Sequence, residues 1–175
     1  MKQILARFDR ADIRITALMA RHGLHLLRMS VGIVFLWFGG LKFFPGLSPA
    51  QDLAVRTIDV LTFGLLPHGT AIVLLAAWEV LIGAGLLAGA CLRATLLLLF
   101  LQMLGAMTPL IIFPGETFTR FPYAPTLEGQ YIVKNLVLIS AGIVLGATVR
   151  GGRIVPDAPK LPRSRETGAA TDGSI

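Results

Sequence analysis

The chain has 175 residues, of which 54% are hydrophobic and 15% are charged, and its formal net charge is +6. A soluble globular domain carries about 25% charged residues, so this composition excludes an ordinary soluble protein and indicates an integral membrane protein. Four apolar segments are long enough to cross a hydrocarbon core about 30 Å thick: residues 24–44, 69–90, 94–113 and 131–149. We therefore expect an all-α, polytopic membrane protein with a bundle of four transmembrane helices.

The N-terminal segment, residues 1–23, has the pattern of an interfacial amphipathic helix. Its apolar residues recur at helical spacing, while arginines occupy the other faces. The apolar positions are Ile4, Phe8, Ala11, Ile15, Leu18 and Met19. We expect this helix to lie flat on the inner leaflet and to set the angle of the first span. A docking surface for a cytoplasmic partner is the alternative.

The distribution of lysine and arginine predicts the orientation in the membrane. Basic residues concentrate in the N-terminal segment, in the turn that holds Arg93 and in the tail from Arg150 onward, whereas Arg56 and Arg120 are the basic residues of the two longer loops. We expect both termini in the cytoplasm and both loops outside. Topology and attraction to anionic lipids account for the positive charge, so we expect a lipid bilayer and no nucleic acid as partner.

The segments outside the four spans have distinct patterns. Asp52, Arg56 and Asp59 share one face of a short helix predicted in the first loop, which we expect to rest on the outer surface with its charges solvated. The second loop contains prolines and aromatic residues, typical of either a structured lid or an aromatic interface belt. Residues 151–175 are rich in Pro, Ser, Thr, Gly and charge, which predicts a disordered cytoplasmic tail.

Three ionisable residues, Lys42, Glu79 and Lys134, lie inside or at the margin of the apolar spans. A charge at such a position costs about 2.5–3.5 kcal/mol even on the lenient insertion scale, so each is a candidate functional residue that needs a partner. Helix direction places both lysines in the outer half and Glu79 a few residues deeper. We predict a Lys42–Glu79–Lys134 cluster. The alternatives are lysines that extend to the headgroups and a purely structural ion pair at Glu79.

Other polar residues of the spans are candidate binding residues. Gln102 lies near the middle of the third span, Asn135 follows Lys134, and Arg28 shares a face of the first span with Lys42. Arg28 and Lys42 are fourteen positions apart, roughly 21 Å along a helix, so Arg28 belongs at the inner boundary.

The order of short motifs resembles the DoxX-like superfamily of bacterial four-helix membrane proteins, most closely its YkgB-type branch. The motifs are RMSVG at 28–32, WFGGLKF at 37–43, WEVLIGAGLL at 78–87, MTP at 107–109 and GQYIVKNL at 129–136. The resemblance covers roughly residues 24–150. It implies a compact four-helix bundle in the bacterial inner membrane. It also implies a link to redox processes, since some members are associated with thiosulfate–quinone oxidoreduction and others with membrane responses to oxidants.

The residues limit what redox chemistry the chain can perform by itself. Cys91 is the single cysteine, which excludes a dithiol mechanism within one chain. His22 and His25 belong at the inner boundary and His68 at the outer one, which argues against a transmembrane haem pair. We expect no intrinsic cofactor and no metal site. A quinone is the candidate exogenous ligand, and a redox partner subunit is the other source of electrons.

Three interpretations of function stay open. In the first, the protein is a redox-associated membrane subunit that binds a quinone in an outer polar pocket, with Glu79 exchanging a proton and the lysines donating to an oxygen. In the second, it is a noncatalytic accessory or assembly protein with an internal charged lock. In the third, it is a small proton-coupled carrier, which would need a homo-oligomer because four helices make a narrow bundle.

Overall fold

The computed structural model describes residues 2–48, 51–152 and 154, with the side chains of residues 2–7 and 10 left undescribed. The described chain is helical apart from one small hairpin. Its elements are α1 (Lys2–Leu41), α2 (Gln51–Leu61), α3 (His68–Ala88), α4 (Leu92–Met107), α5 (Pro109–Ile112), α6 (Pro114–Thr117), β1 (Phe118–Arg120), β2 (Ala124–Pro125) and α7 (Leu127–Thr148). The strands pair antiparallel.

Four helical stretches are long and apolar enough to cross a membrane, which confirms the predicted fold class. They cover Ala11–Leu41, His68–Ala88, Leu92–Ile112 and Leu127–Thr148. The third stretch combines α4 and α5, which meet at Thr108 and Pro109. Proline at this junction cannot donate a backbone hydrogen bond, and this is the physical reason for the interruption.

Close packing of α1 against α3 depends on glycine. A Cβ placed on Gly83 of α3 would lie 2.8 Å from the carbonyl oxygen of Gly32, and one on Gly32 would lie 3.0 Å from the Leu87 side chain. The two backbones therefore approach more closely than a larger residue at Gly83 would permit, as in other membrane helix pairs with small residues at the contact.

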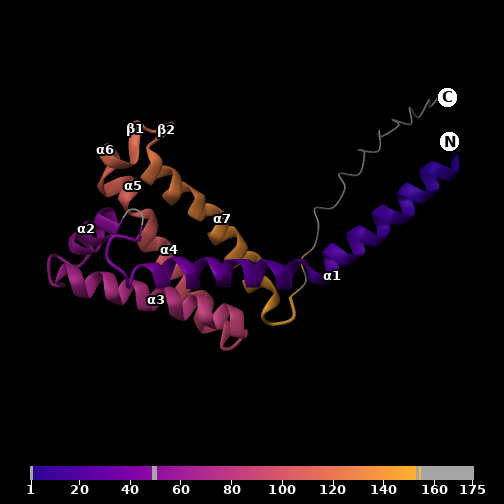
Figure 1. The fold of residues 1–175 in the computed structure, drawn as a ribbon, viewed down its shortest axis with the longest axis horizontal. Helices are drawn as coiled ribbons and strands as arrows, with labels where there is room; N and C mark the ends of the chain where they lie inside the picture. The colour runs from indigo at the N-terminus through magenta and orange to yellow at the C-terminus, as the bar shows by residue number, and fades with distance from the viewer. Residues whose placement is uncertain (1, 49–50, 153, 155–175) are drawn as a thin grey trace, which may run out of the picture.

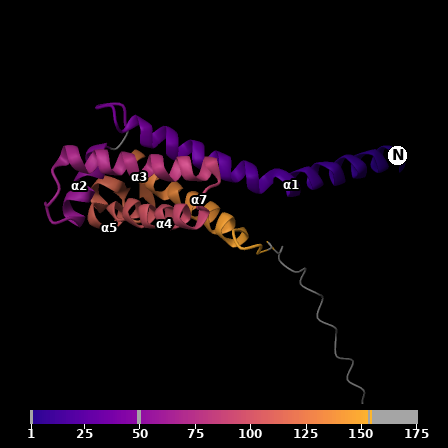
Figure 2. The same ribbon diagram turned by 90° about the horizontal axis from the view of Figure 1, so that it is seen from below.

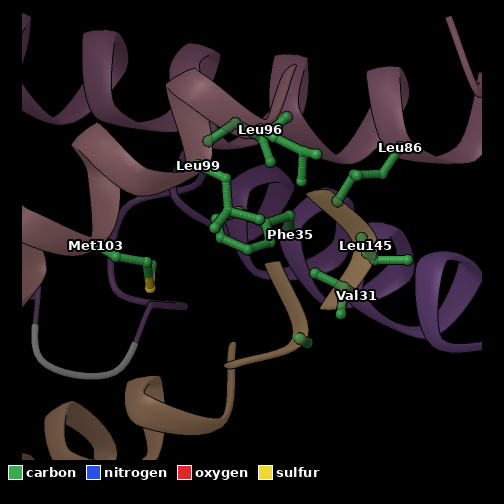
Figure 3. Close-up of a cluster of buried hydrophobic side chains, with 9 residues drawn as sticks. Val31, Phe35, Leu86, Leu96, Leu99, Met103 and Leu145 are labelled. Carbon is green, nitrogen blue, oxygen red and sulfur yellow. The ribbon is translucent and has the colours of Figure 1, made fainter. Parts of the chain in front are cut away.

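The hydrophobic core draws side chains from all four spans. Figure 3 shows most of this cluster, in which aliphatic side chains of α1, α3, α4 and α7 surround Phe35. Its buried members are Val31, Phe35, Ile82, Leu86, Leu96, Leu99, Met103, Ala141 and Leu145. Dispersion contacts among close-packed side chains drive helix association in lipid, where hydrophobic transfer contributes little.

The bundle has two unlike ends. At one end, here called the loop side, lie α2, α5, α6 and the hairpin; the other, the terminal side, holds the turn between α3 and α4, the end of α7 and the departing N-terminal half of α1 (Figure 1). Arg93 and Arg150 belong to the terminal side. The two longer loops are thus grouped at one end and the basic segments at the other, as an even number of spans requires.

The N-terminal segment is helical, as predicted, and continues directly into the first span. α1 runs from Lys2 to Leu41 with no interruption at residues 23 and 24. Its N-terminal half extends beyond the other helices in both views (Figures 1 and 2), and it exposes Phe8, Ile15, Leu18 and Met19. The predicted disordered tail, residues 151–175, lies outside the described residues except for 151, 152 and 154.

Candidate functional site

Glu79 lies near the middle of α3 and is buried, with 9% of its surface exposed. Both of its carboxylate oxygens accept hydrogen bonds from other spans. Lys42 Nζ donates to Oε2 over 2.6 Å, and Gln102 Nε2 donates to Oε1 over 3.0 Å. These contacts therefore link α1, α3 and α4 at one level of the bundle. We call the three residues, Lys42, Glu79 and Gln102, the polar triad.

The Lys42–Glu79 ion pair is shielded from solvent on both sides. The Lys42 side chain is 14% exposed and that of Glu79 is 12% exposed. Removing two charges from water is costly. Their attraction offsets that cost when the distance between the charged atoms is short and the remaining lone pairs of the carboxylate accept hydrogen bonds. The amide of Gln102 meets the second condition. Loss of one partner of such a pair costs about 3–5 kcal/mol, because the other charge stays buried.

Lys42 also closes the end of α1. Its ammonium donates to the carbonyl oxygen of Phe38 over 3.3 Å, while its backbone N–H bonds to Gly39. The last carbonyls of a helix lack intrahelical partners and carry partial negative charge, so a lysine at this position satisfies one of them. The same ammonium therefore joins the end of α1 to the carboxylate of Glu79.

Gly39 permits the approach that brings these groups together. A Cβ at Gly39 would lie 2.7 Å from Glu79 Cβ and 3.0 Å from the backbone nitrogen of Val80. A Cβ at the neighbouring Gly40 would meet no described heavy atom within 4 Å. Gly39 thus faces the stem of Glu79, and Gly40 points into open space.

The depth of Lys42 differs from the sequence prediction. Lys42 was expected near the outer boundary with Glu79 a few residues deeper. Their order holds, because Gly39, three positions before Lys42, faces Glu79 and the ammonium of Lys42 extends back to it, but this level is near the middle of α3. Gln102 is likewise near the middle of the span Leu92–Ile112. The physical reason is that α1 ends at Leu41, beside the residue pair Gly39 and Glu79. The loop-side half of α3 therefore continues beyond the end of α1.

Lys134 is absent from the triad, so the predicted three-charge cluster is wrong in this member. Lys134 is exposed on α7, and its ammonium lies 5.3 Å from the centroid of the Tyr131 ring. Lys134 lies seven positions before the buried Ala141 and so near the same helix face, but at its level this face is exposed. A cation over a tyrosine one turn nearer the loop side fits a lysine that extends toward the headgroups.

The other candidate binding residues are also apart from the triad. Among the described residues, no hydrogen bond joins Asn135 to Lys42, Glu79 or Gln102, and Asn135 is half-buried on α7. Arg28 lies at the terminal side, as predicted, where its Nη2 is 3.5 Å from His25 Nδ1. Its guanidinium fills the space beside Gly89, which ends α3 in the left-handed conformation with φ of 68°.

Trp78 connects α3 to α4 next to the triad. Its indole N–H donates to the carbonyl oxygen of Leu98 over 3.1 Å, one helical turn from Gln102. The side chain of Trp78 is thus engaged in helix packing. Trp37 is 67% exposed on α1, consistent with a lipid-facing position.

A polar cleft on the loop side was not predicted. It has a volume of about 860 Å³ and is lined by Gly46, Ser48, Gln51, Asp52, Leu53, Arg56, Glu116 and Glu128. Arg56 forms an ion pair with Glu116 and lies 5.2 Å from the centroid of the Phe113 ring. The sequence showed that Asp52 and Arg56 share a helix face, but the partner of Arg56, Glu116, comes from the second loop, sixty positions away.

No family model, curated protein or solved structure matches this chain.

Substitution of the two adjacent glycines at the end of α1 tests the approach to Glu79. Gly39→Ala is expected to destabilise the protein by about 1–3 kcal/mol, because the added methyl group overpacks the contact with Glu79. Gly40→Ala serves as the matched control and is expected to be neutral or to stabilise by up to about 1 kcal/mol, since alanine favours a helix over glycine. Unfolding free energies in mild detergent measure both. Equal effects of the two substitutions would contradict the assigned contact.

Proposed function

We propose that this chain is a DoxX-like protein of the bacterial inner membrane that serves as a noncatalytic accessory subunit, with the polar triad as an internal lock between its helices. The observation that carries this proposal is the satisfaction of Glu79 within the chain. Each carboxylate oxygen has a donor at hydrogen-bond distance. A lock of this kind fixes the relative position of three spans, and a partner subunit supplies any redox chemistry.

The engagement of the donors favours a lock over a ligand site. A quinone oxygen needs a hydrogen-bond donor, and Lys42 is the donor that the sequence offers beside Glu79. The ammonium of Lys42 already serves Glu79 and the carbonyl of Phe38, and the amide of Gln102 already serves Glu79. A ligand would have to displace one of these contacts and leave a buried charge with fewer partners, which is costly.

A quinone-binding redox subunit is the second candidate, and one observation favours it. The Lys42 and Glu79 side chains retain 14% and 12% exposure, and Phe38 beside them is 48% exposed. An aromatic ring next to a partly accessible carboxylate is a surface on which a flat quinone head could stack, with Glu79 exchanging a proton. Lys134 has no part in this version, because it is exposed and its ammonium lies over the Tyr131 ring.

Analysis of bound lipids separates the two candidates. The protein purified in mild detergent is expected to carry far less than one quinone per chain when its lipids are extracted and measured by chromatography. A stoichiometric quinone that persists in Lys134→Met and disappears in Glu79→Gln would overturn the accessory role. Size-exclusion profiles of both variants control for loss of folding.

Labelling of cysteines tests the proposed orientation, in which the terminal side faces the cytoplasm. Cys91 is exposed in the turn between α3 and α4, and it should react with a membrane-impermeant maleimide in spheroplasts only after the membrane is broken. An Arg120→Cys, Cys91→Ser variant should react at once, because Arg120 is exposed in the loop-side hairpin. The reverse pattern would contradict the orientation.

A further inference from the structure

The end of α1 near mid-depth leaves half of α3 without a neighbour from the first span. Beyond the level of Glu79, α3 continues for roughly ten residues, or about 15 Å, to its start at His68. Buried residues occur throughout this half, with Ala71 2%, Ile72 8% and Ala76 0% exposed. Here α2 packs against α3, with its own Leu53 and Thr57 buried. The segment between α1 and α3 therefore takes the place that α1 would occupy in a full-length helix pair.

Position beside a transmembrane helix determines the depth of this segment. α3 is apolar over its whole length, so its loop-side half lies in one leaflet of the membrane. Residues 43–48 follow directly from Lys42 near mid-depth, and residues 51–66 lead to the start of α3. They must therefore cross that leaflet alongside α3, instead of lying above it.

The side chains exposed by this segment match such an environment. Phe43, Phe44 and Leu47 are 45%, 59% and 59% exposed just after the end of α1, and Phe63 and Leu65 are 90% and 80% exposed after α2. Contiguous exposed apolar groups mark an interaction surface. On α3, which is apolar enough to cross a membrane, Val73, Leu74 and Leu81 are likewise 49%, 53% and 62% exposed. Because the segment packs beside this helix, acyl chains are the indicated occupant.

The opposite flank of α2 is polar. Asp52 and Arg56 line the cleft of about 860 Å³, and Arg56 pairs with Glu116 of α6. Two of the charges of α2 thus face a polar cleft of the protein, and the third, Asp59, lies 3.9 Å from His68 at the start of α3, while the apolar residues that flank α2 are exposed. An amphipathic helix placed between water and acyl chains has this arrangement.

We propose that residues 43–48 and 51–66 form a partly inserted element of the membrane, with α2 embedded in the loop-side leaflet and Phe43, Phe44 and Leu47 in contact with lipid acyl chains. The element completes the bundle above the end of α1 and covers the polar triad from the loop side. It depends on membrane insertion of α3 and is independent of the role of Glu79 in redox chemistry.

Spin labels report the depth of single positions in liposomes. In a Cys91→Ser background, cysteine at Phe44 or Leu65 is labelled, with Leu81→Cys as the membrane-core control and Arg120→Cys as the aqueous control. Power saturation measures how accessible each label is to oxygen, which concentrates in the membrane, and to a nickel chelate, which stays in water. The Phe44 label should resemble Leu81, with oxygen access exceeding nickel access, and the Leu65 label should be shallower than Phe44.

A Phe44 label as accessible to nickel as the Arg120 label would overturn the proposal, because it would place the segment in water above the membrane. All four positions are exposed, so the labels leave the core intact. Thermal unfolding of each labelled protein verifies the fold, and an environment-sensitive fluorophore at the same four cysteines gives a second reading. Its emission should be shifted to the blue at Phe44 relative to Arg120, and equal emission at these two positions would also overturn the proposal.

Discussion

The ion pair between Lys42 and Glu79 determines how the rest of this bundle is arranged. A carboxylate near the middle of a membrane span needs a partner, and the partner here stands at the C-terminal end of another helix. This pairing holds the end of α1 beside the middle of α3. Gly39 allows the two backbones to approach, and Gln102 satisfies the second oxygen of the carboxylate.

A helix that ends near mid-depth has consequences for both halves of the molecule. In the terminal-side half, α1 packs tightly on α3 and contributes Val31 and Phe35 to the core. In the loop-side half, α2 packs against α3 in place of α1. The Arg56–Glu116 ion pair connects α2 to the second loop. Both donors of the polar triad, Lys42 and Gln102, are engaged by the carboxylate of Glu79, which is the physical basis for assigning the triad a locking role.

The sequence predicted the parts of this arrangement that depend on local pattern. Hydropathy and length placed the four spans, and the cost of a charge in lipid singled out Glu79 and Lys42. The exclusion of Lys134 could not be predicted, because Lys134 shares a helix face with the buried Ala141, and neither depth nor periodicity shows that this face is exposed at the level of Lys134. The depth of Lys42 was also hidden, since it depends on the contact between Gly39 and Glu79. The same contact determines where α1 ends, and therefore which half of α3 is left for α2 to cover.

Two double-mutant cycles in mild detergent test the central pairing most directly. For Lys42→Met and Glu79→Gln, the two single substitutions are predicted to cost together about 1–3 kcal/mol more unfolding free energy than the double variant, because each single change leaves a buried group unpaired. For Lys134→Met and Glu79→Gln, the costs should add to within about 0.5 kcal/mol. A coupling free energy near zero between Lys42 and Glu79, or an equal coupling to Lys134, would contradict the account.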